Sequence, residues 1–214
     1  MHLFFGAFRS VMTSKYSITF ARRGLLLRDS ITLTDLYFKL NDWSTVKQRA
    51  VAENLLQSRT VSTSKKHCSE IISRLRTLTE EQLSLLATGT IDEQRYLLWL
   101  AVCKRYRLLF DFALEVLHEK YLRLDFRLSY DDYDQFFNSK ADWHEELSRL
   151  SVETHKKARQ TVFQLMREAQ LINKHNEILP ILVSAKFLRI VCRDSKANLC
   201  IFPLSDQDVR ALAQ

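Results

Sequence analysis

Residues that break helices are scarce along this chain. Only 3 glycines and 2 prolines occur in 214 residues, while hydrophobic residues make up 46% and charged residues 27%. Such a chain can bury a core and has few points at which a helix must stop. The sequence therefore predicts a mainly α fold, a helical bundle with helix-turn-helix-like or winged-helix-like units and a few short strands. Alternating or apolar runs at residues 16–20 and 199–202 are the expected strands.

Capping residues and apolar periodicity divide the chain into helices. Asp42 and the Thr79-Glu80-Glu81-Gln82 capping box mark two helix starts, and Gly89 marks an end. Further helices are expected at residues 25–40, 42–57, 64–78, 92–117 with a break near 104–107, from 129, 143–150 and 185–191. We expect two subdomains, a helical one at residues 14–124 and a winged-helix-like one at residues 125–214.

The first residues carry no recognisable targeting signal. MHLFFGAFRSV has an arginine inside its apolar run and no basic region before it. Because Met12 opens a more conventional start, residues 1–13 are predicted to be an N-terminal extension, and translation could begin at Met1 or Met12.

The most apolar stretch, residues 96–117, is not predicted to cross a membrane. Its uninterrupted part, Tyr96 to Cys103, is far shorter than the roughly twenty residues that a span requires. Charged residues follow at once. We expect a central core helix, and a protein without a membrane partner.

The charge balance favours a polyanionic partner. The formal net charge is +7 and the isoelectric point is near 9.3. The four cysteines form no CxxC pair, which indicates a reducing compartment, and neither a metal nor another cofactor is expected.

Residues 151–179, SVETHKKARQTVFQLMREAQLINKHNEIL, combine an amphipathic helix with a polar turn between two apolar runs. One face of the helix is apolar over i, i+4, i+7, i+8 and i+11, from Ala158 to Ala169. A basic helix beside a basic hairpin is the shape of a winged helix-turn-helix that reads nucleic acid, although an ordinary surface helix has the same pattern. The predicted contacts in this segment are Lys156, Lys157, Arg159, Gln160, Arg167, Lys174, His175 and Asn176.

A second helix-turn-helix pattern occupies residues 42–78. Cys68, Ile71 and Leu75 share the apolar face of its second helix, and basic residues lie elsewhere around it. Helix pairs of this kind are common in all-α proteins, so a purely structural role stays open. The predicted contacts here are Arg59, Lys65, Lys66, Arg74 and Arg76.

Catalytic motifs are absent from the sequence. The glycines do not cluster into a phosphate-binding loop, and neither a GxSxG elbow nor an HExxH pair occurs. Asp131, Asp132 and Asp134 are expected to be favourable charges in the first turn of a helix that starts after Ser129. We do not expect an enzyme.

Several long motifs resemble the BrxA family. They are GLLLRDS at residues 24–30, AENLLQSRTVSTSKK at 52–66, YLLWLAVCKRYRLLFDFALEVL at 96–117, FFNSKADWHEELSRLS at 136–151 and THKKARQTVFQLMREA at 154–169. The resemblance covers roughly residues 12–203. It implies a cytoplasmic, non-enzymatic accessory protein of the bacterial and archaeal BREX anti-phage defence systems, with a helical fold that has been compared with the RNA-binding factor NusB. It supplies no catalytic residues and no agreed contact residues.

Three functions follow from these observations as hypotheses. The leading one is a double-stranded DNA binder that helps a defence complex to engage DNA. The second is an assembly adaptor that docks other BREX proteins, with the basic charge incidental. The third is a NusB-like binder of RNA.

Overall fold

The computed structural model describes residues 15–20 and 24–212, and it is mainly helical, as predicted. The predicted N-terminal extension and both candidate start sites lie outside the described residues. The helices are α1 (Leu27–Leu40), α2 (Trp43–Ala52), α3 (Val61–Leu75), α4 (Glu80–Thr88), α5 (Ile91–Arg105), α6 (Arg107–Phe112), the π-helix η2 (Ala113–His118), α7 (Glu119–Leu122), α8 (Tyr130–Ala141), α9 (Glu145–Ser148), α10 (Val152–Glu168), α11 (Ala185–Asp194), the 3-10 helix η3 (Lys196–Ile201) and α12 (Asp206–Leu212).

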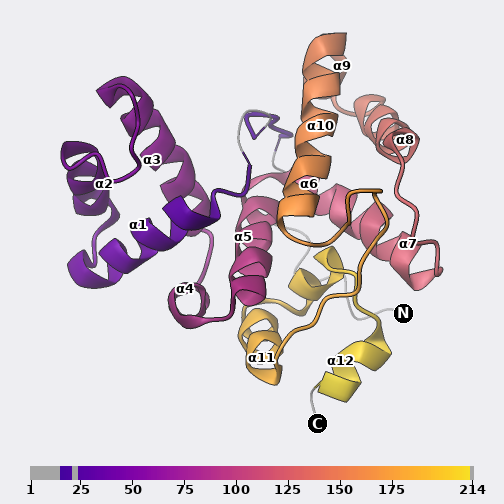
Figure 1. Ribbon diagram of the computed structural model, residues 1–214. Helices are drawn as coiled ribbons and strands as arrows, with labels where there is room; N and C mark the ends of the chain where they lie inside the picture. Colours follow the sequence, from indigo (N-terminus) through magenta and orange to yellow (C-terminus); the bar gives the residue numbers. More distant parts are fainter. Residues whose placement is uncertain (1–14, 21–23, 213–214) are drawn as a thin grey trace.

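Helix α5 lies at the centre of the molecule. Figure 1 shows α1 to α3 on one side of it, α8 to α10 on the other, and α11 and α12 below. Every residue from Tyr96 to Cys103 is buried, which confirms the core-helix interpretation. The indole Nε1 of the fully buried Trp99 donates to the backbone oxygen of Ile201 at 3.0 Å, and this bond attaches the C-terminal part of the chain to α5.

Local sequence signals account for the helix boundaries. Asp42, Thr60, Thr79, Thr90 and Ser129 each accept a hydrogen bond from a backbone amide in the first turn of the helix that follows. The predicted break near residues 104–107 occurs at Tyr106, whose backbone is extended between α5 and α6. Side-chain caps satisfy amides that the first turn leaves unpaired, so these positions are readable from sequence.

The predicted strands were wrong in place. Residues 16–20 form an irregular segment and a turn, and the backbone amide of Tyr16 donates to the Glu146 side chain. Residues 199–201 are the end of η3, and Phe202 follows it. The Ile201 carbonyl accepts a hydrogen bond from the Trp99 indole. Among residues 15–20 and 24–212, neither segment has a neighbouring strand with which to pair. Within the described residues, extended pairing is limited to two isolated antiparallel bridges, Arg127 with Glu177 and Ile172 with Ile178.

The predicted division into two subdomains stays a prediction. The buried apolar side chains form one cluster that includes Leu33 of α1, Trp99 of α5 and Val162 of α10. The helix expected at residues 143–150 is only the short α9, and Trp143 before it is 86% exposed.

Candidate nucleic-acid interface

Helix α10 has the two faces that its sequence predicts. Ser151 caps it by accepting a hydrogen bond from the Thr154 amide at 3.2 Å. The apolar face is fully buried, with Ala158, Val162 and Met166 each at 0% exposure. The opposite face is exposed, and it carries Lys156, Lys157, Gln160 and Gln164. No ion pair among the described residues engages the ammonium groups of Lys156 and Lys157.

Arg159 is not freely available in the way that the helix-face argument suggested. Its guanidinium pairs with the carboxylate of Asp134 on α8 and lies 4.7 Å from the centre of the Tyr130 ring. Only 20% of its side chain is exposed. Arg159 therefore connects α10 to α8. The exposed positive charge of α10 comes from Lys156 and Lys157.

His155 completes this contact between α8 and α10. Its ring packs against Phe137 with centroids 4.1 Å apart, and its Nε2 lies 3.4 Å from Oδ1 of Asp134. Burial lowers the pKa of His155 below its ordinary value, against the opposing attraction of the Asp134 carboxylate. Asp131 and Asp132 lie in the first turn of α8, as predicted, and Asp132 forms a capping box with Ser129. Asp134 lies beyond that turn and pairs with Arg159 instead.

The chain after α10 forms a hairpin-like turn. The Leu179 amide donates to the Leu171 carbonyl, and the Asn173 amide donates to the Glu177 carbonyl, both at 2.9 Å. The Asn173 side-chain oxygen accepts from the amides of His175 and Glu177, which shapes the tip. Lys174 and His175 lie exposed at this tip.

A third extended segment pairs with the same turn. The Leu128 amide donates to the Asn176 carbonyl at 2.9 Å, and the Ile178 amide donates to the Phe126 carbonyl at 2.7 Å. Residues 126–128 thus run beside residues 176–178, which in turn face residues 171–173. Two isolated antiparallel bridges join these three segments next to α10.

Two of the predicted contacts bind one another. The Arg167 guanidinium donates to Oδ1 of Asn176 at 2.7 Å, and Asn176 has a left-handed backbone with φ of 62°. Asparagine tolerates this conformation better than most residues. Arg167 and Asn176 therefore connect α10 to the turn, and neither side chain is fully exposed.

The second predicted unit, α2 with α3, carries its own basic surface. Arg59, Lys65, Lys66 and Arg76 are all exposed. Lys65 and Lys66 line a shallow hollow of about 400 Å³ together with Arg105 of α5. Arg105 was not among the residues predicted from the sequence, because its place beside α3 depends on how α5 packs.

The structure corrects the predicted role of Arg74 as a nucleic-acid contact. It is 3% exposed, and its guanidinium donates to Oε1 of Glu70 and to the backbone oxygen of Gly24, each at 2.8 Å. Glu70 also accepts a hydrogen bond from the Tyr106 hydroxyl. The helical wheel placed Arg74 on a flank of α3, but that flank packs inside the protein, so its role is structural.

The segment at Gly24 and Leu25 joins the two basic units. Arg74 of α3 donates to the Gly24 carbonyl, and the Leu25 amide donates to the carboxylate of Glu168 at the end of α10. A Cβ atom at Gly24 would lie only 2.5 Å from both Glu168 carboxylate oxygens. A larger residue here would force the flexible Glu168 side chain to move away from its bond with the Leu25 amide.

Helices of the described chain are too short and too interrupted by charge to cross a membrane. Among the same residues, no group of three or more His, Cys, Asp or Glu side chains is placed to hold a metal ion.

Comparison with known proteins shows the family. The model of the BrxA family matches residues 14–193. The chain belongs to the BrxA family. A relative from Bacillus cereus, "BREX protein BrxA", is 27% identical over 154 residues, which are 72% of this chain and 77% of that protein. A relative of the same name from Escherichia coli is 28% identical over 127 residues, 59% of this chain and 60% of that protein.

One solved structure has the same fold as this BrxA family member. The crystal structure of an uncharacterized protein from Magnetospirillum magneticum superposes with a TM-score of 0.74 at 18% identity. The match covers 89% of this chain and all of that chain. At this identity it shows the fold alone.

Proposed function

We propose that this protein is a cytoplasmic, non-enzymatic component of a BREX anti-phage defence system and that it binds double-stranded DNA. The relatives named "BREX protein BrxA" support the first part of the proposal. Other BREX proteins are the expected protein partners. The DNA-binding part rests on the geometry around α10.

The order of elements around α10 carries this proposal. The helical run that ends with α7 is followed by the extended residues 126–128, then α8, α9 and α10, then the hairpin-like turn at residues 171–179. The first extended segment pairs with the second half of the turn. This order resembles the connectivity of a winged helix-turn-helix, which supports the proposal that α10 acts as the helix that enters the major groove.

The exposed chemistry of α10 suits a DNA duplex. An α-helix fits the major groove, and Lys156 and Lys157 can neutralise phosphates on its edges. The Gln160 amide can reach a base edge or a phosphate oxygen. Lys174 and His175 extend the contact from the tip of the turn. Arg59, Lys65, Lys66 and Arg76 form a second exposed basic patch on the N-terminal unit.

Competition between nucleic acids tests the proposal. A labelled random-sequence duplex is bound by the protein and displaced by unlabelled duplex DNA, single-stranded DNA or hairpin RNA. We expect the duplex to compete best. Preferential displacement by hairpin RNA would replace the proposal with the NusB-like hypothesis, and no retention of any nucleic acid would favour the adaptor hypothesis.

A pair of charge reversals locates the surface. Lys156→Glu/Lys157→Glu should weaken duplex binding by at least about tenfold, equivalent to about 1.4 kcal/mol. Lys186→Glu/Arg189→Glu makes the same charge change at two exposed residues of α11 and should leave duplex affinity within about twofold. Circular dichroism of both variants checks that they fold. Equal losses in the two variants would contradict a specific role for α10.

A further inference from the structure

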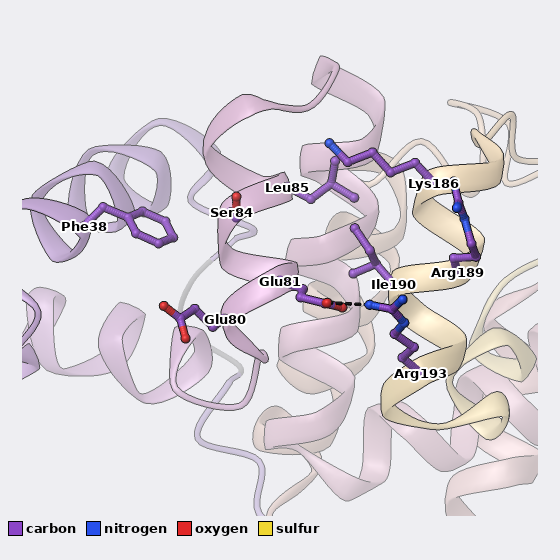
Figure 2. Close-up of a pocket in the computed structure, with 9 residues that line it drawn as sticks. All are labelled: Phe38, Glu80, Glu81, Ser84, Leu85, Lys186, Arg189, Ile190 and Arg193. Carbon is purple, nitrogen blue, oxygen red and sulfur yellow. Dashed lines mark hydrogen bonds and ion pairs between the residues drawn. The ribbon is translucent and has the colours of Figure 1, made fainter.

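A shallow groove of about 660 Å³ lies over α4, away from the residues proposed to contact DNA. Figure 2 shows Phe38 of α1 on one side of α4 and Lys186, Arg189, Ile190 and Arg193 of α11 on the other. Glu80, Glu81, Ser84 and Leu85 of α4 complete the lining.

Basic charge is concentrated on the α11 side of the groove. Lys186, Arg189 and Arg193 follow one another at i, i+3 and i+7, which places them along one face of the helix. Arg193 pairs with Glu81 of α4 at 2.6 Å, the dashed contact in Figure 2. Lys186 and Arg189 have no ion-pair partner in the described part of the chain.

The groove also offers apolar surface. Phe38 is 37% exposed, although phenylalanine is usually buried, and Ile190 is half-buried. Figure 2 shows Ile190 between α4 and the basic side chains of α11. Phe38 and Ile190 thus form an apolar area beside the ammonium of Lys186 and the guanidinium of Arg189. A ligand with an apolar face and carboxylates along the edge of that face would complement this surface.

Helix α11, which forms one side of the groove, is anchored by buried contacts. The inner face of α11 is buried through Phe187, Leu188 and Val191, and Ser184 caps the helix and donates to Glu93 of α5 at 2.6 Å. This side of the groove is therefore ordered before any partner binds, which lowers the entropic cost of binding.

We propose that this groove docks an amphipathic helix of a partner protein whose apolar stripe is flanked by carboxylates. The apolar stripe would lie against Phe38 and Ile190, and the carboxylates would meet Lys186 and Arg189. A nucleic acid fits less well, because the phosphate-lined surface of a duplex would leave the apolar side chains of Phe38 and Ile190 uncovered. The groove would bind a partner protein independently of the proposed DNA interface on α10, so the protein could join an assembly without using its DNA-binding surface.

Selection from a peptide library tests the proposal. Displayed peptides of about five helical turns, with one face randomised, are selected on the full-length protein. We expect enriched peptides to carry apolar residues at helical spacing with Asp or Glu on one flank. Selection without enrichment, or enrichment of peptides rich in Lys and Arg, would overturn the proposal.

Charge reversal then identifies the groove. Binding of the enriched peptide should fall at least tenfold in Lys186→Glu/Arg189→Glu, and a peptide with Lys in place of its carboxylates should regain affinity for that variant. Ser84→Arg, which fills the groove, should also abolish binding, whereas Lys156→Glu/Lys157→Glu should not change it.

Two results would refute this assignment. One is equal peptide affinity in the wild type and in both groove variants. The other is a loss of duplex affinity, rather than peptide affinity, in Lys186→Glu/Arg189→Glu. Failure of the α10 variant to lose DNA binding would instead concern the proposed DNA interface and would leave peptide docking intact.

Discussion

Replacing Arg74 distinguishes a structural arginine from a DNA-contacting one. The side chain is 3% exposed and donates to the Glu70 carboxylate and to the Gly24 carbonyl. Arg74→Ala leaves Glu70, itself 22% exposed, without its main cation, and it leaves the Gly24 carbonyl without this donor. It also removes the contact that ties α3 to the segment before α1.

The expected loss of stability can be estimated from these contacts. Removing one partner of a buried ion pair costs about 3 to 5 kcal/mol. Because Glu70 keeps some access to water and still accepts from the Tyr106 hydroxyl, we expect the lower end, about 3 kcal/mol. For a chain of this size that corresponds to a decrease in Tm of roughly 6 to 12 °C.

Thermal or urea unfolding followed by circular dichroism measures this change. Lys66→Ala is the matched control, because Lys66 is exposed on the same helix, and it should change the free energy of unfolding by less than about 0.5 kcal/mol. The reasoning is refuted if Arg74→Ala unfolds like this control. Arg74 would then be free to act as the DNA contact that the sequence suggested.

Three further variants test other parts of the fold. Gly24→Ala should lower the free energy of unfolding by about 0.5 to 1.5 kcal/mol, because the new Cβ moves the flexible Glu168 side chain away from the Leu25 amide. An unchanged urea midpoint would contradict that close approach. Burial lowers the pKa of His155 in the folded protein, so this imidazole takes up a proton at a higher pH in the unfolded chain than in the folded one. The free energy of unfolding should therefore fall as the pH drops from about 7 through the folded-state pKa. His155→Gln should have a shallower dependence over that range, and an identical slope would show that His155 does not titrate as argued. Trp99→Phe removes the donor to the Ile201 carbonyl, so it should lower the free energy of unfolding, measured by chemical denaturation, by about 1 to 3 kcal/mol. An unchanged free energy of unfolding would show that this hydrogen bond does not stabilise the fold.

Signals contained in neighbouring residues predicted much of the helical architecture. The caps at Asp42, Thr79 and Ser129 satisfy amides within three residues, so no tertiary information is needed to find them. The central position of α5 followed from an apolar run too short and too closely bounded by charge for a membrane span. The faces of α10 followed from periodicity alone.

Roles that depend on a neighbouring helix could not be predicted in this way. A helical wheel shows which side of its own helix a residue occupies, but it does not show what packs there. Arg74 therefore looked exposed although α3 buries it, and Arg159 looked free although Asp134 of α8 holds it. For the same reason Arg105 was missed beside Lys65, since the two lie on different helices.

The false strands have a similar cause. Residues 16–20 and 199–202 have suitable composition, but a strand forms only where another extended segment is available to pair. The polar turn at residues 173–176 was correctly predicted as a turn between two apolar runs, and the structure adds an extended partner for it, residues 126–128.

The salt dependence of duplex binding tests the proposed DNA interface most directly. With about four to six phosphate contacts, log affinity should fall against log salt concentration with a slope of about −4 to −5. Lys156→Glu/Lys157→Glu removes two of these contacts and should make the slope shallower by about 2, with weaker binding at every salt concentration. An unchanged slope and affinity in a folded variant would contradict the placement of DNA on α10.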